Sequence, residues 1–156
     1  MKKKSLIIIT ILAVVFVIYF KDDYPNVTLN TSDIMSKISE NDVTPMILLD
    51  EQQVKDIYGI DVLKLENYVI KIPMMNIRAD EIAILKVKNM DDVEYIKNKL
   101  KVRIENIQNI FKGYLQDQYE LSKNSLIISR GKYILMSVSD KNDDIGTIFK
   151  SYFNNK

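Results

Sequence analysis

Three lysines, Lys2 to Lys4, stand directly before an apolar run from Leu6 to Phe20 that only Thr10 interrupts. The run has no polar face, so it does not fit an amphipathic helix packed on a globular core. A basic start followed by an apolar stretch is typical of a segment that enters a membrane. A spanning helix needs about 20 apolar residues, with about 17 as a lower limit. The sequence therefore predicts a short membrane segment.

Two fates are open for this segment, a cleaved signal peptide or a permanent anchor. Cleavage needs a small-x-small pair, and the stretch from Tyr19 to Pro25 contains none. The chain has no cysteine, so acylation as a lipoprotein is excluded. Lysines before the run and Asp22-Asp23 after it predict a cytoplasmic N-terminus. We expect an uncleaved, single-pass signal anchor, with the lipid bilayer as its partner and the C-terminal domain outside the cell.

The expected domain organisation follows from this placement. Residues 1–4 form a cytoplasmic basic tail, 5–20 a transmembrane signal anchor, 21–30 a linker and 31–156 an extracytoplasmic domain. The length of the last part is typical of one domain.

Residues 31–156 show sequence patterns of both helices and strands. The first helix is expected to begin at Thr31 or Ser32 as its cap. Asp50 and Gln53 have the spacing of a capping box, and Gly59 is expected to end that helix in a left-handed conformation.

A long helix is expected from Asp91-Asp92, as its cap, to about Gln118, and a last helix from Asp143 or Asp144. The apolar residues of the long helix recur every three or four positions: Val93, Ile96, Leu100, Ile104, Ile107, Phe111 and Tyr114.

Four segments are expected to be strands, because apolar residues alternate along them or because a proline or a turn ends them: Tyr68–Ile72, Glu81–Lys88, Leu126–Ser129 and Tyr133–Ser139. The predicted fold class is α+β, an N-terminal transmembrane helix followed by a small domain. That domain has an antiparallel sheet of about four strands with amphipathic helices mainly on one face.

Several landmark residues accompany this order of elements: Tyr58-Gly59-Ile60-Asp61, Ala79-Asp80-Glu81-Ile82-Ala83, Arg103, Gln108, Phe111, Tyr114, Gly131-Lys132-Tyr133 and Ser137-Val138-Ser139-Asp140. From Asp33 to Phe153 the chain resembles the domain-of-unknown-function family 4358 of Gram-positive bacteria of the Firmicutes. The resemblance implies a small envelope domain held by a lipid or an anchor, but it does not indicate which activity, if any, the domain has. Since this chain lacks the cysteine that is acylated in lipoprotein members, the helix is favoured as its anchor.

The missing residue types exclude much chemistry. Without histidine or cysteine there is no Ser-His-Asp triad, thiol nucleophile, histidine metal site or thiolate zinc site. A net charge of +1 gives no electrostatic case for nucleic acid. We expect no enzyme activity and no cofactor.

Two acidic patterns remain. Asp140, Asn142 and Asp144 have the opening spacing of a calcium loop, but Ile145 stands where that loop needs glycine. Helix capping is favoured, and a weak cation site is the alternative. Asp80-Glu81 and Asp91-Asp92 are expected to be structural, with Glu81 pairing with Arg103 or a lysine at the sheet edge.

The sequence thus favours a non-catalytic binding or interaction module of the cell envelope, with an envelope protein or a wall polymer as partner. The alternatives are a ligand-sensing domain and an envelope hydrolase that uses carboxylates alone. The candidate interaction residues rest on the family resemblance: Tyr58, Glu81, Arg103, Gln108 and Tyr114.

Overall fold

The computed structural model describes residues 28–40 and 45–154. The expected basic tail, anchor and most of the linker fall on residues 1–27 and lie outside the described residues. Among the helices that are described, none has the length and apolar character needed to cross a membrane.

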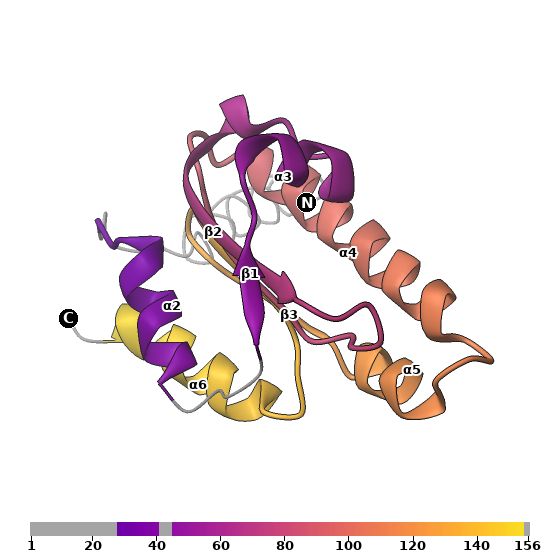
Figure 1. Ribbon diagram of the computed structural model, residues 1–156. Coiled ribbons are helices and arrows are strands. Elements are labelled where there is room, and N and C mark those ends of the chain that lie inside the picture. Colours follow the sequence, from indigo (N-terminus) through magenta and orange to yellow (C-terminus); the bar gives the residue numbers. More distant parts are fainter. Residues whose placement is uncertain (1–27, 41–44, 155–156) are drawn as a thin grey trace, which may run out of the picture.

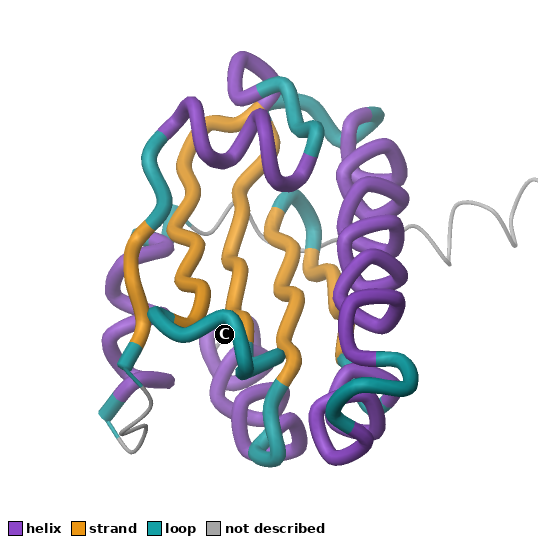
Figure 2. The backbone as a smooth tube through the Cα atoms, turned by 45° about the vertical axis from the view of Figure 1, so that its right-hand side comes forward, coloured by secondary structure: helices purple, strands orange, loops and turns teal. Residues whose placement is uncertain are grey.

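The described chain forms a five-stranded antiparallel sheet with the strand order β1-β2-β3-β5-β4 (Figure 2). The four predicted strands are confirmed, and the additional one, β1, is a three-residue edge strand too short to leave a periodic pattern. The strands are β1 (Met46–Leu48), β2 (Leu65–Pro73), β3 (Glu81–Val87), β4 (Leu126–Arg130) and β5 (Tyr133–Val138).

Helices cover both faces of the sheet, so the expectation of helices mainly on one face is wrong (Figure 1). One core lies between the sheet and α3, α4 and α5, and a second core lies between the sheet and α2 and α6. The reason is visible in β3, where Ala83 and Leu85 join the first core while Ile82 and Ile84 join the second. The helices are α2 (Thr31–Ser39), α3 (Glu51–Tyr58), the 3-10 turn η1 (Val62–Lys64), α4 (Asp92–Phe111), α5 (Gln116–Lys123) and α6 (Asn142–Asn154).

Local signals fix the ends of the short helices. In α3 the predicted capping box is confirmed: Asp50 accepts from the Gln53 N–H at 2.8 Å, and the Gln53 side chain accepts from the Asp50 N–H at 2.9 Å. Gly59 ends this helix with φ of 61°, a conformation that costs little only for glycine. In α2 the cap is Asn30, which precedes the expected Thr31 or Ser32 by one or two residues.

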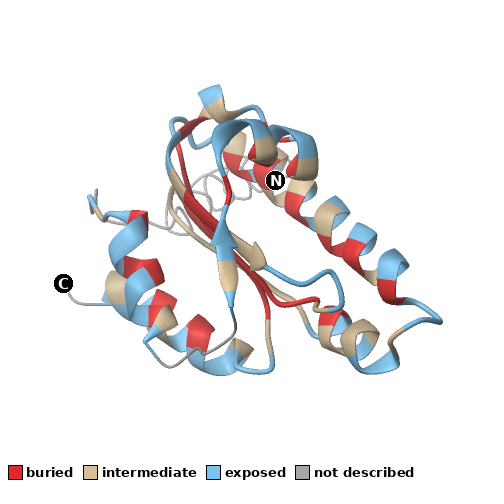
Figure 3. Cartoon of the chain, in the orientation of Figure 1, coloured by how far each residue is buried: buried red, intermediate tan, exposed pale blue. Residues whose placement is uncertain are grey.

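The long helix α4 buries six of the seven predicted apolar positions (Figure 3). It ends at Phe111 and not near Gln118, because Gly113 takes φ of 77° and turns the chain into the separate helix α5. Tyr114 is consequently 69% exposed. The expected cap is also corrected: Asp91 makes no side-chain capping bond, and Asp92 pairs with Lys64 at 2.5 Å.

The two ends of the sheet differ in what lies beside them. At the end where β5 begins, the Tyr133 hydroxyl accepts from the Leu29 N–H at 2.7 Å and donates to the Leu29 carbonyl at 3.0 Å. Phe153 packs on the same tyrosine ring, with 5.4 Å between centroids. Both limits of the described chain therefore lie at this "terminal end" of the sheet (Figure 1). The opposite "loop end" carries the connection from Pro73 to Glu81.

Candidate functional site

Three of the five candidate interaction residues meet in one buried cluster, formed by Tyr58, Glu81 and Arg103. Arg103 donates from Nε to Oε1 of Glu81 at 2.9 Å and from Nη2 to Oε2 at 2.7 Å. The Tyr58 hydroxyl donates to the same Oε1. The side chain of Glu81 is 2% exposed and that of Arg103 is 16% exposed. Of the two partners expected for Glu81, Arg103 or a lysine at the sheet edge, the structure shows Arg103.

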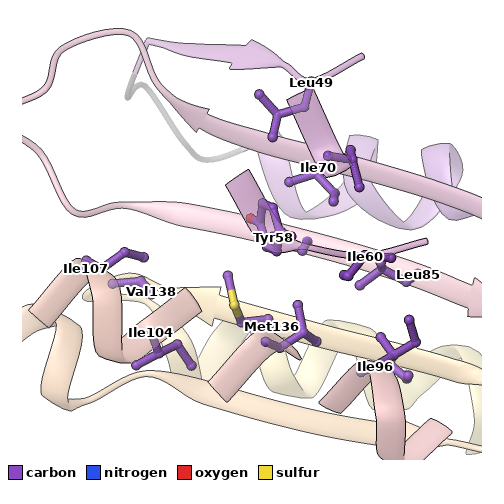
Figure 4. Packing of buried hydrophobic residues seen from close by; sticks show 14 of the residues in the cluster. Leu49, Tyr58, Ile60, Ile70, Leu85, Ile96, Ile104, Ile107, Met136 and Val138 are labelled. Atoms are coloured by element: carbon purple, nitrogen blue, oxygen red, sulfur yellow. The ribbon is translucent and has the colours of Figure 1, made fainter. Parts of the chain in front are cut away.

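Each member comes from a different element of the first core. Tyr58 is the last residue of α3, Glu81 opens β3 at the loop end, and Arg103 lies one residue before the buried Ile104 on α4. The guanidinium carbon lies 5.6 Å from the centre of the Tyr58 ring. Figure 4 shows Tyr58 among the buried apolar side chains of this core.

Burial and charge set the protonation states of the cluster. Burial, reinforced by the negative charge of Glu81, raises the pKa of Tyr58 well above its ordinary value. Burial opposes the charge on Arg103, but hydrogen bonds and charge from Glu81 outweigh it and raise the pKa of the guanidinium. Tyr58 is therefore a neutral donor at pH 7. Glu81 is a poor general base, because both of its oxygens already accept hydrogen bonds.

Arg103 and Glu81 also reach the wall of an open groove at the loop end, with a volume of about 290 Å³. We call it the loop groove. It lies between the β2–β3 connection and the last turns of α4, and most of its wall is apolar. Its residues are Ile72, Pro73, Met74, Met75, Asn76, Arg78, Ala79, Glu81, Arg103, Ile107, Ile110 and Phe111.

The β2–β3 connection that forms one side of the groove is held at its base. The Ala79 N–H donates to the Gln118 side chain on α5 at 2.9 Å. Arg78 pairs with the buried Asp80 at 2.8 Å. Further out, Met74, Met75 and Ile77 are exposed. The connection thus has a fixed base and an apolar tip.

The other two candidate residues lie outside the cluster. Gln108 donates from its side chain to the Ser122 carbonyl at 3.3 Å and so links α4 to α5. Tyr114 lies on the short connection between these two helices, and its N–H donates to the Phe111 carbonyl at 3.0 Å. Gln108 is therefore a packing residue, and Tyr114 is a surface residue close in sequence to the groove.

Most residues of the groove wall were not among the candidates. The signal that points to them is the presence of Met74, Met75 and Ile77 in an irregular loop, where apolar side chains have no pattern that would bury them. The structure explains these apolar residues, because it places the end of α4 beside the loop and the two together form the groove.

The acidic pattern at Asp140, Asn142 and Asp144 lies across the start of α6. The described chain contains no group of three or more acidic, histidine or cysteine side chains placed to hold a metal ion. Asn142 opens α6, and its amide donates to the Asn124 carbonyl at 2.6 Å. This bond joins the start of α6 to the end of α5.

The fold and the buried cluster define a small α+β domain with a two-sided core and an apolar groove at one end. Residues 39–139, from the end of α2 to just beyond β5, match the family described as "Domain of unknown function (DUF4358)". The chain belongs to this family, so the resemblance seen in the sequence is confirmed. No curated protein and no solved structure matches it.

Proposed function

We propose that the protein is a non-catalytic binding module of the cell envelope, anchored in the membrane by its N-terminal apolar segment, with the loop groove as its binding face. The observation that carries the proposal is the apolar wall of this groove, whose outer side chains are exposed at Met74, Met75 and Ile110. Exposed apolar side chains gathered around a concavity are typical of an interaction site.

The groove does not have the composition of a carboxylate-based hydrolytic site. Glycoside hydrolysis needs two carboxylates about 5–10 Å apart across a cleft. Along the described groove wall Glu81 is the single carboxylate, and both of its oxygens accept hydrogen bonds from Arg103 or Tyr58. This favours binding over the hydrolase alternative.

The groove also differs from the pocket expected of a ligand sensor. Such a pocket would be enclosed between helix and sheet, whereas this groove opens to solvent beside the exposed residues Met74 and Ile110. An open groove suits a partner that remains partly outside it, and this supports an interaction module.

The location of the groove suggests where its partner lies. The described chain begins at the terminal end of the sheet, beside Tyr133, and the groove lies at the loop end. The nine residues of β2 separate these ends, a distance of about 30 Å at about 3.3 Å per residue. A domain attached to the membrane at its terminal end would present the groove away from the bilayer, toward an envelope protein or wall polymer.

A pull-down of the full chain from native membranes tests the proposal. Ile110→Asp places a charge on the groove wall, and Val102→Asp is its matched control. Both residues lie on α4 and have similar exposure, 57% and 51%, but Val102 is outside the groove wall. Arg103→Ala is less informative, because it also removes the partner of Glu81.

We expect wild type and Val102→Asp to recover the same partner and Ile110→Asp to lose it. Tyr114→Ala reports whether the contact extends past the end of α4. If wild type and Ile110→Asp recover the same set of proteins, the groove is not the binding face and the proposal fails.

A further inference from the structure

We infer that the loop groove binds an extended apolar peptide segment of an envelope protein, and that a carboxylate of this segment contacts Arg103. The inference rests on the proposed function and names the class of partner.

The apolar wall of the groove suits the apolar side chains of a peptide better than it suits a sugar polymer. Ile107, Ile110 and Phe111 form the helix side of the groove, and Met74 and Met75 form the loop side. Methionine is flexible and polarisable, so it adapts to different apolar side chains. A volume of about 290 Å³ admits a few such side chains and not a whole folded element.

The polar part of the groove has an excess of hydrogen-bond donors. A guanidinium carries five N–H groups. Glu81 accepts from two of those of Arg103 and the Tyr58 oxygen interacts with a further one, which leaves about two for an occupant of the groove. Glu81 has little capacity for more, because it also accepts from Tyr58. Arg78, which pairs with Asp80, adds a second positive charge to the wall. An occupant that supplies an anionic oxygen complements this charge distribution.

The excess of hydrogen-bond donors favours a peptide over a lipid acyl chain as the occupant of the groove. An acyl chain would cover the remaining N–H groups of Arg103 and offer them no acceptor, which is unfavourable. An extended peptide supplies carbonyl oxygens along its length and a carboxylate at an acidic side chain or at its C-terminus. The separation of the groove from the terminal end, where the chain enters the domain, also disfavours the bilayer that holds the anchor.

Selection from a random dodecapeptide library tests the inference, with the full chain in lipid nanodiscs as bait and Ile110→Asp for counter-selection. Enriched peptides should combine apolar residues with a carboxylate. A synthetic peptide of the enriched sequence should bind wild type and Val102→Asp equally. Its affinity for Ile110→Asp should fall by about tenfold or more, as expected for a charge placed in an apolar contact.

Two further measurements examine the role of Arg103. Replacing the peptide carboxylate by an amide should weaken binding to wild type about tenfold, since a charge-assisted hydrogen bond is lost. In Arg103→Lys, which keeps the charge next to Glu81 but has fewer donors, the difference between acid and amide should shrink. Hydrogen exchange of each variant in the absence of peptide confirms that the fold is retained.

The outcomes are distinct. The inference is wrong if no peptide prefers wild type to Ile110→Asp, or if the amide peptide binds as well as the acid. It is also wrong if phosphatidylglycerol vesicles or dodecanoate bind in an Ile110-dependent way while peptides do not. In these cases a positive pull-down from native membranes still supports the proposed function. A negative pull-down contradicts both the inference and the proposed function.

Discussion

Replacing Arg103 by methionine removes the charged partner of Glu81 while keeping an apolar stem of similar length. Two hydrogen bonds to a carboxylate that is 2% exposed are lost, and among the described side chains Tyr58 remains as its donor. Leaving one member of a buried ion pair without its partner costs about 3–5 kcal/mol. The free energy of unfolding of a small domain is about 5–15 kcal/mol. Arg103→Met should therefore remove a large part of the stability of this domain.

Urea unfolding of the full chain in a non-ionic detergent at pH 7, followed by circular dichroism, measures this loss. Lys101→Met is the control, since Lys101 is an exposed residue of the same helix and should change stability by about 0.5 kcal/mol or less. The double variant Glu81→Gln/Arg103→Met should be less destabilised than the sum of the single variants, because no uncompensated charge is buried. If Arg103→Met unfolds within about 1 kcal/mol of wild type, the structural role assigned to the pair is wrong.

Three further substitutions test other parts of the account. Tyr58→Phe should cost about 2 kcal/mol at pH 7 for the lost bond to Glu81. The folded-state pKa of Tyr58 is raised, so its contribution is complete below about pH 10 and is lost as the pH rises through the folded-state pKa. The difference in urea midpoint between wild type and Tyr58→Phe should therefore narrow above about pH 10, and an unchanged difference would refute the assignment. Gly59→Ala should cost about 1–2 kcal/mol in the same assay, because φ there is 61°, and no loss would contradict the left-handed end of α3. Gly146→Val should cost about 1–3 kcal/mol, because even a Cβ at Gly146 would lie 3.0 Å from a Leu126 methyl carbon. A fully stable Gly146→Val would show that α6 packs less closely on β4.

Helices and strands could be predicted from the sequence where residues at a regular spacing specify them. The stripe on α4 and the capping box of α3 depend on residues three or four positions apart, and the structure confirms them. The end of α4 was missed because Tyr114 continues the apolar spacing, whereas the conformation of Gly113 decides where the helix stops. The second core was missed although Ile82 and Ile84 stand between the residues of the first, because an alternating apolar pattern was expected to bury only one face.

The candidate site was predictable only in part. Pairing of Glu81 with a basic residue, either Arg103 or a lysine at the sheet edge, was expected. The contribution of Tyr58 depends on how α3 packs against the sheet. The loop groove depends on tertiary packing still more. Met74 and Met75 belong to a loop without periodicity, and they form a groove only with the end of α4, which lies about 35 residues later in the chain.

Photo-cross-linking in intact cells tests most directly the central claim that the loop groove is the binding face. A photoreactive residue replaces Met75 at the loop end, and a matched one replaces Leu63, an exposed apolar residue at the terminal end. The account predicts a discrete protein cross-link from position 75 that Ile110→Asp abolishes and that position 63 does not give. Equal cross-linking from both positions, or cross-linking from position 75 that Ile110→Asp leaves intact, would contradict it.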